Sequence, residues 1–230
     1  RNLLQARRRT ALLGLALMFV TMLLVLLQAL SAGIADSMKT SATTLSTGHL
    51  NVAGWYKTKP TDSAPVVMDK ATVRKTAEEI LAKDIDYVID RHRGFGKLVS
   101  DTGSTISGFT GVDPAQEERL KKTLVLAKES DYVEGGSEER KGDLTKLGQP
   151  GTIVVFANIA KRIGVRVGDS LTMTSQSFTG IANSAEATVV AVAEDIGLLS
   201  SFSNFVNTKT ILDLYQLKDT TTGAVQVYLK

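Results

Sequence analysis

The chain has 230 residues, 43% of them hydrophobic, and 27 basic against 24 acidic side chains give a formal net charge of +3. Arg1, Arg7, Arg8 and Arg9 account for +4, so the rest of the chain carries a formal charge of −1. The charge therefore indicates no nucleic-acid partner. The absence of cysteine excludes disulfides, thiolate metal sites and a cysteine nucleophile, and it suits an oxidising compartment.

Residues 10–35 contain no charged side chain and follow the arginine-rich flank 1–9. A membrane-spanning helix needs about 20 apolar residues, so this segment predicts a transmembrane helix. The basic flank predicts a cytoplasmic N-terminus and places residues 48–230 on the far side of the membrane. A cleaved signal peptide is the alternative, because small residues occur up to Ala35. Its apolar region would cover only about 7–15 residues, so a retained anchor is favoured.

Residues 36–47 predict a helical stalk. Apolar side chains recur at helical spacing from Ile34 to Leu45, beyond the first carboxylate at Asp36. A helix that leaves the membrane without a break would act as a lever, with Asp36, Met38 and Leu45 along it.

The next part of the chain alternates between strand and helix patterns. A polar loop covers 57–64, and Asp69 is placed to cap a helix over 70–83. Period-two alternation predicts strands at 49–52, 85–89, 97–100 and 104–109, the last two forming a hairpin.

Asp113-Pro114-Ala115-Gln116 predicts the start of a helix that continues to about residue 128, with Asp113 as N-cap and Pro114 at the first helical position. Glycines and charges then predict a surface excursion over 134–151. The remaining predicted elements are strands at 153–156, 170–174, 187–193 and 224–229, a helix at 158–163 ended by Gly164, a loop at 179–183, and a helix capped by Asn207 with Ile211, Leu212 and Tyr215 facing inward.

Strand–helix–strand order occurs at both ends of the outer domain, with a different pattern between them. This arrangement predicts an α+β fold of two lobes. The two ends would build the first lobe, about 48–110 with 185–230, and residues 111–184 the second.

Sequence signatures of catalysis are missing. There is no P-loop motif and no G-x-S-x-G nucleophile elbow. Gly94-Phe95-Gly96 lacks the third glycine of a dinucleotide-binding fingerprint and predicts a turn beside a strand. His49 and His92, the only histidines, form no zinc motif. We expect no enzyme, no cofactor and no metal site.

The remaining charged pairs and clusters are expected to be solvated. Glu117 and Glu118 are adjacent on a predicted helix, where neighbouring side chains do not face each other and so cannot act as an acid–base pair. The basic cluster 91–93 is expected to lie in a solvated loop.

Three segments resemble a known family. They are Thr47-Gly48-His49 after the stalk, Gly111-Val112-Asp113-Pro114 before the predicted helix, and residues 159–169, which contain Gly164, Gly168 and Asp169. Together they resemble the ABC-transporter permeases of the MacB/FtsX type, and most closely those of lipoprotein-releasing complexes (LolC/LolE-like). The motif residues themselves suit turns and helix ends, which is a structural role.

The resemblance implies a MacB-like periplasmic core domain in a bacterial inner-membrane protein with four spans. Residues 1–230 would be the first span and the domain that follows it. The implied partners are a cytoplasmic ABC ATPase dimer, which hydrolyses the ATP, a second permease copy or paralogue, and a periplasmic carrier or adaptor. The implied substrate is lipid-anchored or otherwise hydrophobic. Met18, Phe19 and Met22 would line a membrane cavity, or equally face lipid.

Three functions remain open from the sequence. The first is a permease subunit, for lipoprotein release or for MacB-like export of small molecules or peptides. The second is a single-pass receptor whose outer domain binds a ligand. The third is a transmembrane regulator of a cell-wall hydrolase.

Overall fold

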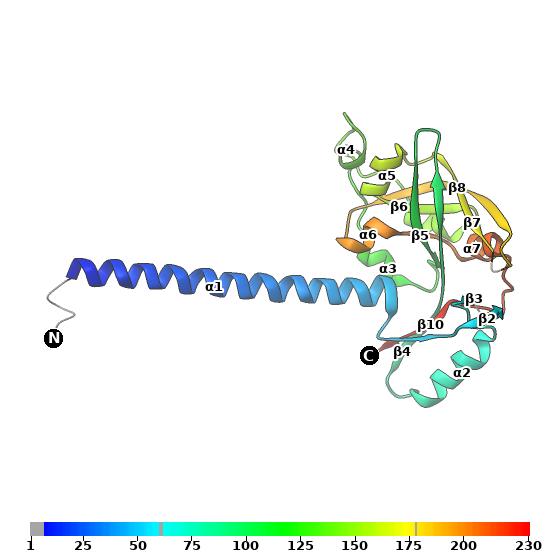
Figure 1. Ribbon diagram of the computed structural model, residues 1–230, viewed down its shortest axis with the longest axis horizontal. Helices are drawn as coiled ribbons and strands as arrows, with labels where there is room; N and C mark the ends of the chain where they lie inside the picture. Colours follow the sequence, from blue (N-terminus) through cyan, green and yellow to red (C-terminus); the bar gives the residue numbers. More distant parts are fainter. Residues whose placement is uncertain (1–6, 60–61, 178) are drawn as a thin grey trace. The chain divides into compact units, whose positions relative to one another are not determined.

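The computed structural model describes residues 7–59, 62–177 and 179–230 (Figure 1). The chain divides into two compact units, Arg1–Ala42 and Thr43–Lys230.

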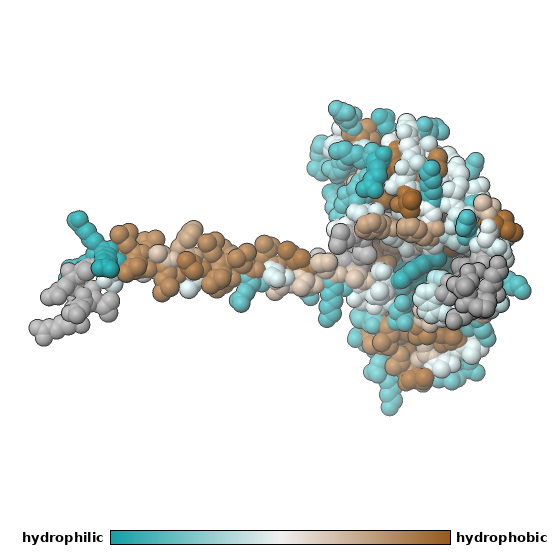
Figure 2. All heavy atoms as spheres, in the orientation of Figure 1, coloured by the Kyte–Doolittle hydropathy of each residue, from teal (hydrophilic) through white to brown (hydrophobic). Residues whose placement is uncertain are grey.

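The first unit consists of the helix α1, Arg7–Ala42, which contains the whole predicted span 10–35. Its segment Arg7–Asp36 has a mean hydropathy of 2.6 in its most apolar window, and none of that window is buried against protein. Figure 2 shows hydrophobic side chains along the visible surface of α1. By length and composition α1 can cross a membrane, a property that a signal sequence shares.

The second unit is a mixed α+β domain, in agreement with the predicted fold class. Its main sheet has the strand order β1-β10-β4-β5-β9-β6-β8-β7, and β2 pairs with β3 separately. The strands are β1 Leu50–Ala53, β2 Tyr56–Lys59, β3 Asp62–Ala64, β4 Ile85–Val99, β5 Ser104–Val112, β6 Thr152–Phe156, β7 Ser170–Gln176, β8 Ala182–Ala193, β9 Ser203–Asn207 and β10 Ala224–Leu229.

The domain also contains short helical segments. They are a π-helical turn at Thr43–Thr47, α2 Lys70–Ile80, α3 Glu118–Thr123, α4 Glu129–Tyr132, a 3₁₀ turn at Leu144–Gly148, α5 Ala157–Ile163, α6 Leu198–Phe202 and α7 Thr208–Tyr215.

An additional pairing between β4 and β7 closes the sheet on itself. Strands β4, β5, β9, β6, β8 and β7 therefore form a barrel, with Lys97 paired to Thr174 at the seam. Strand β4 is long enough to serve two sheets: its first half pairs with β10 and its second half with β5 and β7. Outside the barrel, β1 and β10 extend the first half of β4 as a three-stranded sheet.

Two glycines let other elements approach β4 where it passes from one sheet to the other. A Cβ on Gly94 would lie 2.3 Å from the ring of Tyr215, and one on Gly96 would lie 2.3 Å from the Thr174 carbonyl oxygen. The expectation of a turn at 94–96 is therefore wrong: these residues lie inside a strand, and the glycines serve close packing.

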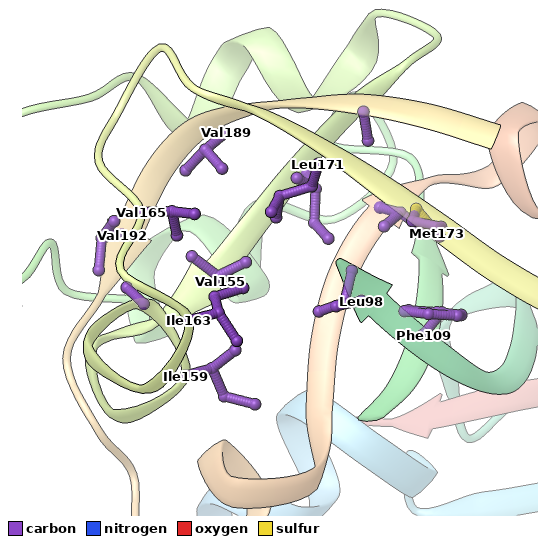
Figure 3. Packing of buried hydrophobic residues seen from close by; sticks show 14 of the residues in the cluster. Leu98, Phe109, Val155, Ile159, Ile163, Val165, Leu171, Met173, Val189 and Val192 are labelled. Carbon is purple, nitrogen blue, oxygen red and sulfur yellow. The ribbon is translucent and has the colours of Figure 1, made fainter. Parts of the chain in front are cut away.

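The largest hydrophobic cluster lies inside the barrel and under α5 and α7. Figure 3 shows Leu98, Phe109 and Met173, from three different strands, lying together, with Val155 and Ile163 nearby. A separate small cluster fills the space between α2 and the three-stranded sheet, through Ala77, Val88, Val225 and Val227.

Several predicted helix ends are confirmed. The Asp69 side chain accepts a hydrogen bond from the Thr72 amide at the start of α2, and Asn207 does the same for Lys209 at the start of α7. Gly164 ends α5 in the left-handed conformation, with φ of 67°. Local signals sufficed here because capping depends on neighbouring residues.

The predicted helix over 113–128 is wrong. Asp113 caps only a turn, accepting a hydrogen bond from the Ala115 amide at 3.0 Å, and the helix α3 begins later, at Glu118. The side chain of Glu117 points inward instead of lying on a helix surface, and beyond α3 the backbone is extended, with Leu126 bridging to β8. Tertiary contacts override the local helical pattern here.

Other differences concern strands. The predicted loop 57–64 instead contains β2 and β3, apart from residues 60–61, which lie outside the described residues. The predicted strand 85–89 and the first hairpin strand are one strand, β4, and β8 begins at Ala182, inside a predicted loop. The elements α6 and β9 were not predicted.

The proposed division of residues 48–230 into two lobes, with limits near 110 and 185, stays a prediction. In the structure, residues 43–230 form one compact unit, and β4 runs through both the three-stranded sheet and the barrel.

Candidate functional site

The site begins at the π-helical turn Thr43–Thr47, here called the junction turn, which follows α1 directly in the chain. Leu45 is 3% exposed and belongs to a hydrophobic cluster that includes Val112, Leu120 and Phe156. The junction turn also contacts α3. The last part of the predicted stalk is therefore embedded in the domain, whereas Asp36 and Met38 are exposed on α1.

Side chains of the domain bind the carbonyl groups of the junction turn. The Gln226 amide nitrogen and the Arg93 guanidinium both donate hydrogen bonds to the Ser46 carbonyl oxygen. The last carbonyls of a helix lack partners within the helix, and the negative end of the helix dipole favours cations. An amide and a guanidinium at this oxygen satisfy both requirements.

Tyr228 provides a second attachment. Its hydroxyl donates a hydrogen bond to the Thr44 carbonyl oxygen at 3.0 Å, and its ring stacks on Tyr87 with centroids 4.3 Å apart. Burial raises the pKa of the Tyr228 hydroxyl, which keeps its proton available for this bond. The ring stacking restricts the position of the hydroxyl.

The residues Thr47-Gly48-His49 connect the junction turn to β10. Gly48 has φ of +68°, and its amide donates to the Thr43 carbonyl oxygen at 2.9 Å. The His49 amide donates to the Val227 carbonyl oxygen at 3.0 Å, and its Nδ1 accepts from the Leu229 amide. This motif thus has a structural role: the glycine supplies a left-handed backbone, and the histidine anchors the chain to β10.

A buried ion pair lies behind these contacts. Arg91 on β4 is fully buried and Glu117 is 4% exposed. The guanidinium donates twice to the carboxylate, with Nη1–Oε1 at 3.0 Å and Nη2–Oε2 at 2.6 Å. Its Nε lies 3.4 Å from Oε1 of Gln226, the residue that binds Ser46. A single polar network therefore runs from α3 through β4 and β10 to the junction turn.

Burial dominates the electrostatics of this network. Burial raises the pKa of the Glu117 carboxyl, while the charge and hydrogen bonds of Arg91 oppose the rise. Burial also lowers the pKa of the Arg93 guanidinium, and the nearby Arg91 charge adds to that effect. The Arg91 and Glu117 charges are removed from water and are stable because they are paired and hydrogen-bonded, whereas Arg93 remains exposed.

The second motif shapes the helical side of the site. A Cβ on Gly111 would lie 3.2 Å from His92 Cβ, so glycine permits close packing there. Val112 is fully buried in the Leu45 cluster, and Asp113 and Pro114 turn the chain towards Glu117. Val112 and Leu45, 67 positions apart, are thus brought into one cluster.

The third motif has contacts of its own on other elements. Gly164 ends α5, and Gly168 has φ of +100° in the turn before β7. The Asp169 carboxylate accepts a hydrogen bond from the Arg166 amide at 2.8 Å. None of these residues is part of the network at the junction turn.

The predicted cavity residues Met18, Phe19 and Met22 are exposed on α1, and a lining role for them stays a prediction. Among the described residues, no group of three His, Asp or Glu side chains is arranged to hold a metal ion. His92 is 1% exposed, and its Nε2 lies 2.9 Å from the Thr221 carbonyl oxygen.

The sequence-based expectation for the ion-pair residues was wrong. Glu117 was expected on a solvated helix face and Arg91 in a solvated loop, but both are buried. Their burial follows from the length of β4, which places Arg91 on the face of the three-stranded sheet that also holds Gln226 and Tyr228. The alternation over 85–89 was the one available signal, and it stops short of Arg91.

Two cavities border the site. One, of about 160 Å³, lies between Leu45 and the barrel, with walls formed by Phe109, Phe156 and Phe205. A wider groove of about 980 Å³ is lined by Phe95 and Tyr215 among others. The Tyr215 hydroxyl donates to the Phe95 carbonyl oxygen, accepts from the Phe95 amide, and is hydrogen-bonded to Ser175 at the edge of this groove.

Fold and site together define an α+β domain that follows an apolar helix in the chain and that binds its own first turn, Thr43–Thr47, through polar side chains. The sequence matches no family model and no curated protein. Several solved structures are similar, among them two domains of transporters. For the periplasmic region of MacB from Actinobacillus actinomycetemcomitans, the TM-score is 0.43 at 17% identity over 68% of this chain and 64% of that one.

For the extracellular domain of the noncanonic ABC-type transporter YknZ from Gram-positive bacteria, the TM-score is 0.45 at 10% identity over 70% of this chain and 72% of that one. The present chain thus spans just under two thirds of the MacB region. Similarity at this level does not carry the activity of either protein over to this chain.

Proposed function

We propose that this chain is the first span and the extracytoplasmic domain of a non-catalytic permease subunit in an ABC transporter of the MacB/FtsX type. The observation that carries the proposal is the attachment of the junction turn. The turn begins at Thr43, the residue after the end of α1, and its carbonyl groups are bound by side chains of β4 and β10. The resemblance of the three sequence motifs supports the same assignment.

In this proposal α1 acts as a lever. A cytoplasmic ATPase dimer closes on ATP and displaces the spans, and the junction turn transmits that displacement to β4, β10 and α3. Leu45 transmits it through apolar contacts, and Ser46 through hydrogen bonds. A flexible linker would dissipate the motion, so the proposal requires α1 and the turn, which are consecutive in the chain, to move together.

The finer proposal is release of lipid-anchored proteins from the bacterial inner membrane. It is supported by the resemblance of Thr47-Gly48-His49 to the start of the periplasmic domain in lipoprotein-releasing permeases. A second permease copy or paralogue would complete the transporter, and a periplasmic carrier would accept the substrate. The basic flank before α1 supports a cytoplasmic N-terminus. Export through a periplasmic adaptor is the alternative within the same class.

The test is purification of the tagged full-length gene product from gently solubilised membranes. The proposal predicts a stoichiometric partner that carries a P-loop and hydrolyses ATP in the purified complex. An unrelated single-span protein with the same tag is the control for adventitious capture. A lipoprotein carrier in the complex would favour release, and an adaptor would favour export. A kinase or cell-wall hydrolase without an ATPase would refute the permease and favour a receptor or regulator.

A further inference from the structure

We propose that the Arg91–Glu117 pair is a latch that determines whether the junction turn is held by the domain. The mechanical meaning of the latch rests on the proposed function. The link between the ion pair and the hold on the turn does not, because it is a property of this domain alone.

The junction turn is held from two sides. On the strand side, Gln226 and Tyr228 of β10 bind the carbonyls of Ser46 and Thr44. These side chains lie on the face of the three-stranded sheet opposite Val225 and Val227, which pack against α2.

On the helical side, α3 contacts the turn, and Leu120 and Leu124 share a hydrophobic cluster with Leu45. The helix is only six residues long. The residue before it, Glu117, makes no side-chain hydrogen bond to the first amides of the helix. Helical hydrogen bonding therefore fixes the position of α3 weakly, and external contacts must hold it.

The ion pair joins the two sides. Arg91 belongs to β4, which is paired with β10, and Glu117 is the residue before α3. The two-bond geometry sets both the distance and the orientation between the sheet and α3. Through Nε, the same guanidinium orients Gln226, which binds Ser46.

Stability alone does not explain a buried pair at this place. Apolar residues of similar volume stabilise a protein interior as well as a buried ion pair does, because the pair must first lose its hydration. What apolar side chains cannot reproduce is the directed contact with Gln226. We therefore treat Arg91 and Glu117 as positioning residues for the turn.

The chain contains a matched control. Asp86 and Arg119 also join β4 to α3, with a distance of 2.5 Å between their charged groups, but these side chains are 39% and 46% exposed. Solvent-exposed pairs contribute little to stability. Asp86→Asn therefore removes an ion pair between the same two elements and leaves every hydrogen bond of the buried network in place. Arg119, which also lies over the rings of Tyr87 and Tyr228, keeps its charge in this variant.

The experiment is hydrogen–deuterium exchange by mass spectrometry on the full chain in lipid nanodiscs. The reporters are the amides of Gly48 and His49, which are bonded to the Thr43 and Val227 carbonyls, and the reference is the barrel strand β6. The variants are Glu117→Gln, the apolar double variant Arg91→Met with Glu117→Leu, and Asp86→Asn.

The latch predicts at least tenfold faster exchange of the two reporter amides in Glu117→Gln and in the double variant, with β6 unchanged in the double variant. In Asp86→Asn the two reporter amides should exchange at the same rate as in the natural protein. Natural protection of the reporters in a folded double variant would overturn the latch, because the pair would then serve folding only. Loss of protection throughout the double variant would overturn it as well.

The outcome is separate from the test of the proposed function. Faster exchange at the turn without an associated ATPase would keep the latch and refute the permease. An associated ATPase with unchanged exchange would keep the permease and refute the latch. If both hold, Glu117→Gln should also lower the amount of substrate moved per ATP hydrolysed, while Asp86→Asn should not.

Discussion

Replacing Leu45 by alanine tests whether the junction turn is part of the domain core. Leu45 is 3% exposed, and alanine removes three carbon atoms from its side chain. At about 0.8 kcal/mol for each buried CH₂ group, the transfer contribution is about 2.4 kcal/mol. The 160 Å³ cavity that Leu45 borders shows that neighbouring groups do not already close around it. The new void will therefore persist and add to the cost.

We expect a total loss of about 3 kcal/mol in the free energy of unfolding, within the usual range of about 2–5 kcal/mol for this substitution. For a domain of this size, that loss corresponds to a decrease of roughly 6–12 °C in Tm. The assay is urea unfolding of the full chain in detergent, followed by circular dichroism, with calorimetry for Tm. We expect the apolar helix α1 to stay helical in detergent, so the transition reports on residues 43–230.

Leu50→Ala is the matched control, because Leu50 is 43% exposed on β1. Removing the same atoms there should cost less than about 1 kcal/mol, as for most surface substitutions. If Leu45→Ala also costs less than 1 kcal/mol, the turn is not embedded in the core. The proposal that it transmits motion would then lose its structural basis.

Three further predictions concern single sites. Gly48→Ala should cost about 1–2 kcal/mol in urea unfolding, because the backbone is left-handed and a Cβ would lie 3.2 Å from Gln226 Cβ; a cost below about 0.5 kcal/mol would contradict this explanation. Gly94→Ala should lower the free energy of unfolding by about 1–3 kcal/mol because its Cβ meets the Tyr215 ring. This loss should be smaller when Tyr215→Leu is also present, and strictly additive effects of the two substitutions would argue against the clash. The hydrogen bond from Lys141 lowers the pKa of Glu129 to about 2. The ionised carboxylate therefore stabilises the fold above its unfolded pKa of about 4.5, and this contribution is lost as pH falls from 4.5 towards 2. Glu129→Gln should flatten the decrease in Tm over that range, and an unchanged pH profile would exclude the pair as its source.

Local sequence signals determined the features that depend on neighbouring residues. The apolar run at 10–35 determined α1, because a long uncharged segment can be stabilised in few other ways. Asp69 and Asn207 determined the starts of α2 and α7 through caps that reach only two or three residues, and Gly164 determined the end of α5. The three motifs indicated turns, and all three contain a glycine where the backbone needs one.

Tertiary structure decided the features that depend on distant residues. The pattern after Asp113 is helical by itself, yet the chain unwinds there because Glu117 pairs with Arg91 and the following segment bridges to β8. The barrel closes through β4 and β7, strands whose pairing no local signal reveals.

The candidate site illustrates the same division. Gly48 and His49 were singled out from the sequence, but Gln226 and Tyr228, which bind the turn, were not. Gln226 lies 135 positions from Arg91 and 180 from Ser46, and nothing in the sequence near any of these residues indicates the others. Burial of Arg91 is favourable only once Glu117 and Gln226 are in place around it, so the network exists only in the folded domain.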